Sequence, residues 1–334
     1  MPQRVLVTSW LMREDDPSFQ ILRDAGVEVV VRRSPRPRTA DDMIGHLAGI
    51  HGVVAGSDNY SAPVLRAAFD LQVICRVGVG YDTVDLAVAT ERGIQVGTTP
   101  GTNQDAVADY AFGLILASAR RIVGHHISTA AGEWRREPGP DVWQKTIGIV
   151  GAGAIGRGVA RRARGFDMTV LAYDVQQDAR WAAELGVRYV DLDELFATAD
   201  YVTLHAPLMP ATRHLVNAAR LERMKRTAYL INTARGELVD LDALVVALNE
   251  GHIAGAALDV FPREPPTDHP ILRARNVVLS PHVAGGSEEA NAAGGAMACR
   301  SVVAALRGGR VAFCVNPEVF ASASGRARAM RLPI

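Results

Sequence analysis

The stretch TIGIVGAGAIGRGVARRA, residues 146–163, contains the pattern that decides the fold. Its first five residues predict a buried strand, and the residues from Ala154 onward predict a helix. Gly151, Gly153 and Gly156 lie at the turn between the two. In that order they permit a tight turn, the approach of backbone amides to a pyrophosphate, and close packing of helix on strand. The stretch therefore predicts a dinucleotide-binding unit.

An acidic side chain, Asp174, ends the next predicted strand, LAYD. Its carboxylate can accept hydrogen bonds from ribose hydroxyls and would repel a 2′-phosphate, and Val175 supplies no compensating cation. In the purely structural alternative, the glycines are only turn residues and Asp174 is only a helix cap. Strand, glycines and acid in sequence favour the dinucleotide, with NAD preferred to NADP.

Two series of short β-rich segments flank and continue from this unit. The first series precedes it: RVLVT (4–8), VEVVV (27–31), GVVA (52–55), VIC (73–75) and IQVG (94–97). The second begins at TIGIV and continues through MTVLAY, YVTLHA, TAYLIN, IAGAALDV and NVVLS (276–280). Helical patterns separate most of these segments, which predicts two α/β domains with parallel sheets.

Two longer helical segments stand out. Residues 103–126 are apolar on more than one face, so we expect one long helix that joins the domains and is buried, in part against a second subunit. Residues 287–309 predict an Ala-rich helix, and 321–334 a loose tail.

The composition excludes several functions. A chain of 334 residues favours two domains, and 36 Lys+Arg balance 36 Asp+Glu, so no nucleic-acid partner is expected. No signal peptide or membrane-spanning apolar run is present, which predicts a cytoplasmic protein. Cys75, Cys299 and Cys314 lack the spacing of a disulfide framework or a metal site.

Three polar residues follow strands of the second series: Arg235, Glu264 and His282. Removing a hydride from a secondary alcohol requires a base for the hydroxyl proton, and histidine has a suitable pKa. A carboxylate such as Glu264 would orient the imidazole, and a guanidinium would bind the carboxylate and carbonyl of a 2-keto acid. Taken singly, each has a plain structural alternative: an ion pair, a solvated loop residue, or a packed core histidine.

Six motifs together resemble the D-isomer-specific 2-hydroxyacid dehydrogenases, over residues 4 to about 320. They are RVGVGYDTVDL, TTPGTNQDAVADYAFGLILASARR, GIVGAGAIG, NTARGELVD, ALDVFPREP and PHVAGG. The resemblance is to the short form without a regulatory domain, as in phosphoglycerate dehydrogenase-like proteins. It implies that Arg235, Glu264 and His282 are the catalytic arginine, glutamate and histidine.

The resemblance also implies an architecture. A Rossmann NAD-binding domain, residues 99–286, would be inserted into a flavodoxin-like substrate-binding domain formed by residues 1–98 and 287–320. Both would be doubly wound parallel α/β sheets, with the active site in the cleft, and the protein would form a homodimer.

Further site residues follow from the same resemblance. The cofactor set is Gly151, Gly153, Ala154, Ile155, Gly156, Asp174, Ala206, Pro207, Thr233, Ala234, Asp259 and Gly285. The substrate carboxylate would be held by the loop Arg76, Val77, Gly78, Val79 and Gly80, whose amides can bind an anion. His205 is either a loop residue near the cofactor or a packed strand-end histidine, and no metal is expected.

The substrate stays open at this point. The leading interpretation is NAD-dependent oxidation of a D-2-hydroxy acid or reduction of a 2-keto acid, with D-3-phosphoglycerate as one candidate. However, Gly56 stands where phosphoglycerate enzymes often have arginine, and Asp58 would oppose a phosphate if it pointed inward. Glyoxylate, hydroxypyruvate and phosphite are alternatives, and an NAD-sensing protein like the corepressors of this fold is a non-enzymatic one.

Overall fold

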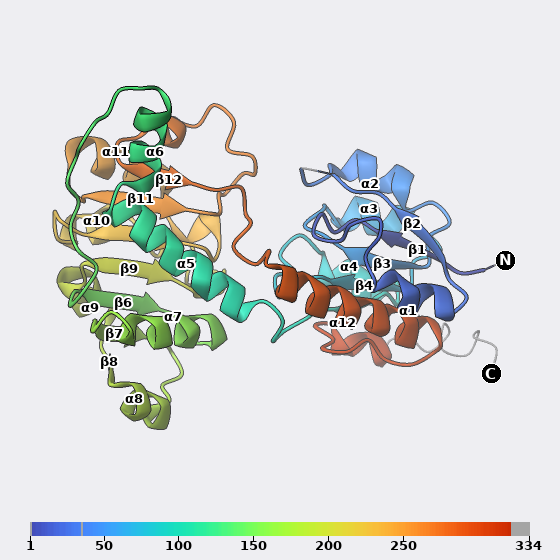
Figure 1. The fold of residues 1–334 in the computed structure, drawn as a ribbon. Helices are drawn as coiled ribbons and strands as arrows, with labels where there is room; N and C mark the ends of the chain where they lie inside the picture. Colours follow the sequence, from blue (N-terminus) through green and yellow to red (C-terminus); the bar gives the residue numbers. More distant parts are fainter. Residues whose placement is uncertain (1, 35, 322–334) are drawn as a thin grey trace. The chain divides into compact units, whose positions relative to one another are not determined.

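The structure is a computed structural model that describes residues 2–34 and 36–321 (Figure 1). Contacts between Cα atoms divide the chain into two compact units. The first unit contains the residues up to Asn103 and those from Gly286 onward, and the second contains Gln104–Gly285. The tail expected at 321–334 lies, apart from Ala321, outside the described residues.

The first unit is built on a five-stranded parallel sheet with the order β2-β1-β3-β4-β5. Its strands are β1 (Arg4–Val7), β2 (Glu28–Val31), β3 (Gly52–Ala55), β4 (Val73–Arg76) and β5 (Gln95–Gly97). Its helices are α1 (Phe19–Asp24), α2 (Ala40–His46), α3 (Ala62–Ala67), α4 (Leu86–Glu91) and α12 (Glu288–Leu306), with the 3₁₀ turn η3 (Pro317–Phe320).

Both faces of this sheet are buried. Leu6, Val53 and Ile74 pack with the α2, α3 and α4 side, whereas Val54 and Val73 pack with α1 and α12. Consecutive strand residues therefore serve opposite cores, as the two-residue period of a strand requires.

The second unit is built on a seven-stranded parallel sheet with the order β12-β11-β10-β9-β6-β7-β8. Its strands are β6 (Thr146–Val150), β7 (Thr169–Tyr173), β8 (Val187–Tyr189), β9 (Tyr201–Leu204), β10 (Tyr229–Asn232), β11 (Gly255–Leu258) and β12 (Val277–Leu279). The strand order reverses between β6 and β9, and ligands of open α/β sheets bind at such switch points, beyond the carboxyl ends of the strands.

Helices cover both faces of the second sheet. They are α5 (Gln104–Ala119), α6 (Ile122–Ala130), α7 (Ala154–Arg164), α8 (Ala179–Leu185), α9 (Leu192–Thr198), α10 (Ala218–Arg223) and α11 (Leu241–Glu250), with the 3₁₀ turns η1 (Gly236–Leu238) and η2 (Pro270–Arg273). One core contains Ile149 and Ile231 with α5 and α7, and the other contains Val150 and Leu230 with α9 to α11. The two doubly wound parallel sheets confirm the expected fold class.

Two features differ from the sequence-based expectation. The helix expected over 103–126 is wrong as one element, because it breaks into α5 and α6 at Arg121, whose φ of 52° is left-handed. The short edge strand β8 was not expected, since three residues carry too little alternation to be recognised.

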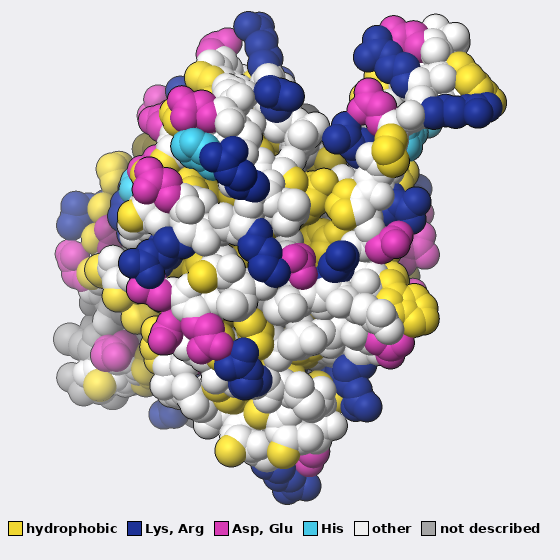
Figure 2. All heavy atoms as spheres, turned by 90° about the vertical axis from the view of Figure 1, so that its left-hand side faces the viewer, with side chains coloured by type: hydrophobic (Ala, Val, Ile, Leu, Met, Phe, Trp, Pro, Cys, Tyr) yellow, Lys and Arg dark blue, Asp and Glu magenta, His cyan; other side chains and the backbone are white. Residues whose placement is uncertain are grey.

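The described helices include none long and apolar enough to cross a membrane. Figure 2 shows one face of the molecule, on which basic and acidic side chains are interspersed without a field of one sign. This distribution agrees with the formal net charge of zero.

Candidate active site

The glycine loop joins β6 to α7 at the switch point of the second sheet. Gly151 has a φ of 98°, and a Cβ there would lie 2.7 Å from the backbone of His205 and Ala206. A Cβ on Gly156 would lie 2.1 Å from the Gly151 oxygen, so only glycine lets the helix start this close to the loop. At Gly153 nothing lies within 4 Å of an added Cβ.

The N-terminus of α7 is exposed and lacks a side-chain cap. Its N-cap residue is Gly153, which has no side chain that could accept a hydrogen bond from a first-turn amide. Gly153 and Ala154 are exposed, and Ile155 is partly buried. In contrast, α8, α9, α10 and α11 are each capped by an Asp or Asn side chain. First-turn amides left without a side-chain acceptor suit the binding of a phosphate.

Asp174 lies directly after β7, beside the glycine loop. Its Oδ2 accepts a hydrogen bond from the Ala152 amide at 2.7 Å, and its Oδ1 accepts one from the Gln176 amide at 2.9 Å. The carboxylate is therefore fixed next to the residue that separates Gly151 from Gly153.

The residues after β9 and β10 lie next to each other at the same edge, because Leu204 pairs with Asn232. His205 and Thr203 are hydrogen-bonded through Nε2 and Oγ1 at 2.9 Å. Two buried atoms here, His205 Nδ1 and Thr233 Oγ1, have no hydrogen-bond partner among the described residues. Ala206, Pro207 and Ala234 follow in the same two loops and are half-buried or exposed.

Burial also affects the charge of His205. It lowers the pKa of the imidazole from 6.5 to about 3, because the charged form would lose its hydration. His205 is therefore neutral at physiological pH.

Arg235 is held by a buried asparagine. Asn232, with 0% of its surface exposed, donates through Nδ2 to the Arg235 oxygen at 2.8 Å and accepts from the Ala234 amide at 3.0 Å. A Cβ on the next residue, Gly236, would lie 2.0 Å from the Phe261 backbone. The loop after β10 therefore packs directly on the loop after β11 that leads to Glu264.

Glu264 and His282 are in contact. Glu264 Oε2 and His282 Nδ1 lie 2.8 Å apart, and Glu264 Oε1 accepts the Phe261 amide at 3.1 Å. The histidine side chain is 42% exposed and the glutamate 24%, so the imidazole is accessible while its partner is more covered. His282 has a φ of 55°, a conformation that non-glycine residues rarely adopt and that surrounding contacts must maintain.

Asp259 supplies those contacts. It is fully buried at the end of β11, and its carboxylate accepts hydrogen bonds from Ser280 Oγ at 2.7 Å, the Val283 amide at 3.0 Å and the Ala284 amide at 2.8 Å. Its backbone oxygen accepts the His282 amide at 2.8 Å. Both carboxylate oxygens thus hold the histidine loop, which ends at Gly285, and this role was not foreseen from the sequence.

The predicted substrate loop lies in the first unit, at the end of β4. The Val77 amide donates to the Ala55 oxygen at 3.0 Å and the Gly78 amide to Thr99 Oγ1 at 2.7 Å. Arg76 Nε donates to the Gly80 oxygen at 2.9 Å. Among the described residues no acceptor receives the amides of Val79 and Gly80. Within Val77 to Gly80, the amides of Val79 and Gly80 are therefore the two that remain available for an anion among the described residues.

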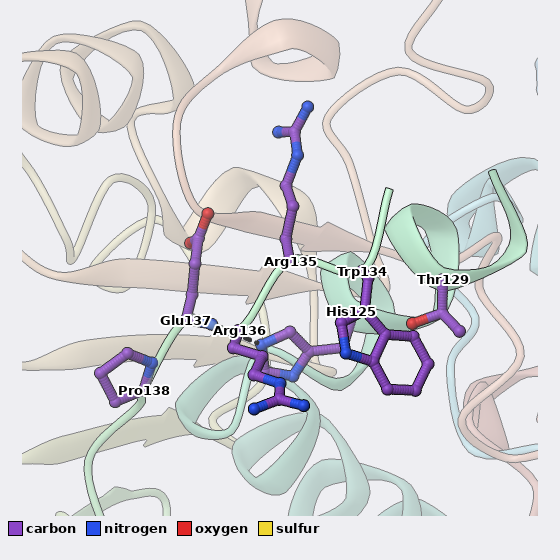
Figure 3. Close-up of a pocket in the computed structure, with 7 residues that line it drawn as sticks. All are labelled: His125, Thr129, Trp134, Arg135, Arg136, Glu137 and Pro138. Carbon is purple, nitrogen blue, oxygen red and sulfur yellow. Dashed lines mark hydrogen bonds between the residues drawn. The ribbon is translucent and has the colours of Figure 1, made fainter. Parts of the chain in front are cut away.

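A hollow of about 500 Å³ lies elsewhere in the second unit (Figure 3). It belongs to the segment of α6 and the following loop up to Gln144, which we call the arm. His125 and Thr129 come from α6, and Trp134 to Pro138 from the loop. No candidate catalytic residue lines it, so we do not assign the chemistry to it.

The second unit thus fits a dinucleotide. The close approaches at Gly151 and Gly156, the open space at Gly153 and the two orphan polar atoms lie at one sheet edge. The three catalytic candidates and all the cofactor candidates belong to this unit. No group of three or more His, Cys, Asp or Glu side chains within residues 2–34 and 36–321 is arranged to hold a metal ion.

Comparison with known proteins gives a family match. Residues 112–284 match the model described as "D-isomer specific 2-hydroxyacid dehydrogenase, NAD binding domain". A glyoxylate reductase from Thermofilum pendens is 41% identical over 91% of this chain and 92% of its own. A D-3-phosphoglycerate dehydrogenase from Methanocaldococcus jannaschii is 41% identical over 79% of this chain but 51% of its own.

The fold has a similar solved structure. A Thermus thermophilus protein superposes with a TM-score of 0.84 at 38% identity, covering 94% of this chain and all of that one.

The buried His205 generates a prediction about pH and stability. Below pH 6.5 the unfolded chain binds a proton at this imidazole, whereas the folded chain does not until about pH 3. The free energy of unfolding should therefore fall as the pH falls through this window. Relative to His205→Gln, the wild type should lose about 2 kcal/mol between pH 6.5 and pH 5. Denaturant titrations of both proteins at several pH values measure this, and equal slopes would contradict it.

Proposed function

The chain belongs to the D-isomer specific 2-hydroxyacid dehydrogenase family, and we propose from this that it reduces glyoxylate, or a similarly small 2-keto acid, with NADH. Membership makes it a nicotinamide-dependent oxidoreductase of 2-hydroxy acids. The observation that carries the proposal is the 2.8 Å contact between Glu264 and His282 beyond the strand ends of the dinucleotide-binding sheet.

The relatives favour glyoxylate over phosphoglycerate, the first candidate from the sequence. The glyoxylate reductase from Thermofilum pendens matches over nearly its whole length, while the phosphoglycerate dehydrogenase matches over about half of its own. We therefore place the small 2-keto acid ahead of the phosphorylated one.

The end of β3 supports a substrate without a phosphate. A Cβ on Gly56 would lie 3.0 Å from the Thr8 oxygen and 3.2 Å from Ser9 Cα, so this position has little room for an arginine. Asp58 is buried and pairs with Arg38 Nη1 at 3.1 Å, where both side chains are less than 9% exposed. The pairing keeps the Asp58 carboxylate on Arg38, and it leaves the Arg38 guanidinium engaged with that carboxylate and not with a substrate phosphate.

His282 is the proposed proton carrier. When bound, the nicotinamide ring supplies or accepts the hydride. In reduction the imidazolium gives its Nε2 proton to the oxygen that was the carbonyl, and in oxidation the neutral imidazole takes the hydroxyl proton. Because Nδ1 faces Glu264, Nε2 is the nitrogen left to meet the substrate.

Glu264 and Arg235 have supporting roles in this proposal. The glutamate carboxylate fixes the orientation of the imidazole through its contact with Nδ1. The guanidinium binds the substrate carboxylate and polarises the keto oxygen, where negative charge develops. In the first unit, the amides of Val79 and Gly80 are the groups that we propose for binding a carboxylate.

For the cofactor we propose NAD. The α7 N-terminus would bind the pyrophosphate of NAD. Asp259 and Gly285 would lie near its nicotinamide. Other parts of the NAD would contact backbone groups of Ala154, Ile155, Ala206, Pro207, Thr233 and Ala234. Asp174 would accept hydrogen bonds from the adenosine ribose, and its charge would oppose a 2′-phosphate.

A second copy of the chain is the proposed partner. Ile122, Ile127, Trp134 and Trp143 of the arm are more than half exposed. Beside the arm, a second hollow of about 440 Å³ is lined in part by Ile127, Tyr229, Ala274 and Val277. Large exposed apolar side chains on the arm, beside a hollow that the arm and sheet residues line together, can form a self-complementary two-fold interface, so we propose a homodimer.

A substrate panel tests the proposed function. With NADH absorbance as the readout, kcat/KM for glyoxylate should exceed that for 3-phosphohydroxypyruvate by about tenfold or more, because Arg38 at the end of β3 is already paired with Asp58. Hydroxypyruvate and pyruvate complete the panel. A higher kcat/KM for the phosphorylated acid would overturn the assignment.

The role of His282 predicts a specific defect. His282→Ala should still bind NADH but lose turnover by about 10²- to 10⁴-fold, the usual contribution of a general acid. The matched control is His252→Ala, which removes a histidine that also pairs with a glutamate, Glu250, at 3.4 Å. Wild-type turnover in His282→Ala would place the proton donor elsewhere.

The role of Asp174 predicts a change in cofactor preference. Asp174→Ala should reduce the ratio of kcat/KM with NADH to that with NADPH by about tenfold or more, because the repulsion of the 2′-phosphate is removed. Initial rates with both cofactors measure this ratio. A wild type that already prefers NADPH would refute the argument.

The arm predicts the oligomeric state. Light scattering after size exclusion should give about twice the chain mass of 35.7 kDa for the wild type and the single mass for Ile127→Glu/Trp134→Glu. Phe69→Glu, which changes a 75% exposed aromatic in the first unit, should stay dimeric. A monomeric wild type would reject the interface.

A further inference from the structure

Arg157, the residue after the last glycine of the loop, makes a contact that sequence alone does not show. Its Nε donates to the Ala152 oxygen at 3.0 Å. Ala152 is the same residue whose amide donates to Asp174 at 2.7 Å. A cation and an acid therefore hold opposite sides of one residue in the glycine loop. Val175, the residue after Asp174, supplies no cation, but Arg157 of α7 brings a guanidinium to the same loop from a different part of the sequence.

The other end of the guanidinium is held by α8. Arg157 Nη1 lies 2.9 Å from Asp178 Oδ2, and Arg157 Cζ lies 4.9 Å from the centroid of the Trp181 ring. Asp178 is also the N-cap of α8, and its Oδ1 accepts the Trp181 amide at 3.0 Å. The Trp181 amide first, and Arg157 second, lower the pKa of Asp178. The arginine is thus fixed by an acid, a ring and a carbonyl.

This arrangement bears on the choice between the two dinucleotides. A 2′-phosphate beside Asp174, the acid that follows β7, requires a cation. The guanidinium of arginine is the side-chain group that binds phosphate best. Arg157 contacts Ala152, the residue that also bonds to Asp174, yet its Nη1 is paired with Asp178. Its side chain remains 35% exposed, so a change of partner needs no unfolding of the core.

We infer that Asp178 is a specificity-determining residue, which keeps Arg157 from binding a 2′-phosphate and so acts with Asp174 to restrict the site to NAD. The inference rests on the proposed preference for NAD. Asp174 repels the phosphate directly, whereas Asp178 pairs with Arg157, a cation that would otherwise attract it. Arg157 itself then serves to position the glycine loop through Ala152.

A plain structural role would give the same contacts. Arg157 would then only connect α7 and the glycine loop to α8. Removing the charge of Asp178 would make the loop less well held, and the affinity for phosphate would not increase. When the charge of Asp178 is removed, the specificity role therefore predicts tighter binding of a 2′-phosphorylated ligand, whereas the structural role predicts no gain.

The test uses binding without turnover. The probe is adenosine 2′,5′-bisphosphate, with 5′-AMP as its partner lacking the 2′-phosphate, titrated by calorimetry into the full-length protein. Asp178→Asn is the variant, because asparagine caps a helix as well as aspartate but carries no charge to hold Arg157. It is added to an Asp174→Ala background, which removes the direct repulsion.

Asp174→Ala/Asp178→Asn should bind the bisphosphate about tenfold more tightly than Asp174→Ala, with a smaller change for 5′-AMP, because a charge-assisted contact to phosphate is gained. Adding Arg157→Gln should abolish the gain. Asp191→Asn is the matched control, since it neutralises the equivalent cap of α9, where Asp191 accepts the Glu194 amide at 2.8 Å. This control should leave the bisphosphate affinity unchanged.

Unchanged or weaker bisphosphate binding in the double variant, or a gain that survives Arg157→Gln, would overturn the inference. Failure of the proposed NAD preference is measured separately, from the ratio of kcat/KM with NADH to kcat/KM with NADPH in the wild type and in Asp174→Ala. The effect of Asp178 is read from the dependence of bisphosphate affinity on Arg157, so the two failures are distinguishable.

Discussion

The site depends on one buried carboxylate. Asp259 has no exposed surface, and leaving its charge without partners would cost several kcal/mol. Three donors from residues 280–284 meet that charge, which compels the chain after β12 to fold back over the end of β11. His282 lies within this forced turn, and its left-handed backbone is held there by the pairing of its amide with the Asp259 oxygen.

The same constraint extends along the sheet edge. The Asp259 amide donates to the Asn232 oxygen at 2.9 Å, and Asn232 in turn holds the loop of Arg235. Two buried polar residues at the ends of adjacent strands therefore anchor all three catalytic candidates, directly or through the packing of Gly236 on Phe261. Parallel strands make this possible, because their carboxyl ends lie at one edge.

Much of this could be predicted from the sequence, because the decisive signals are local. The buried strands are continuous apolar runs, and the glycine loop combines a strand, a turn and a helix within residues 146–163. What could not be predicted depends on contacts between distant segments: the hold of Asp259 on residues 280–284, the approach of Arg157 to Ala152, and the pairing of Asp58 with Arg38. The break at Arg121 was missed because apolar residues continue on both sides of it.

The first unit is assembled from two ends of the chain. Ala298, Val302 and Leu306 of α12 lie in the same core as Val5, Val54 and Val73. During synthesis the segment up to Asn103 would leave the ribosome with one face of its sheet covered by α1 but not yet by α12, and the second unit would be complete before α12 emerged. Folding order is therefore inverted relative to chain order, and the early segment has to remain unaggregated while the later one matures.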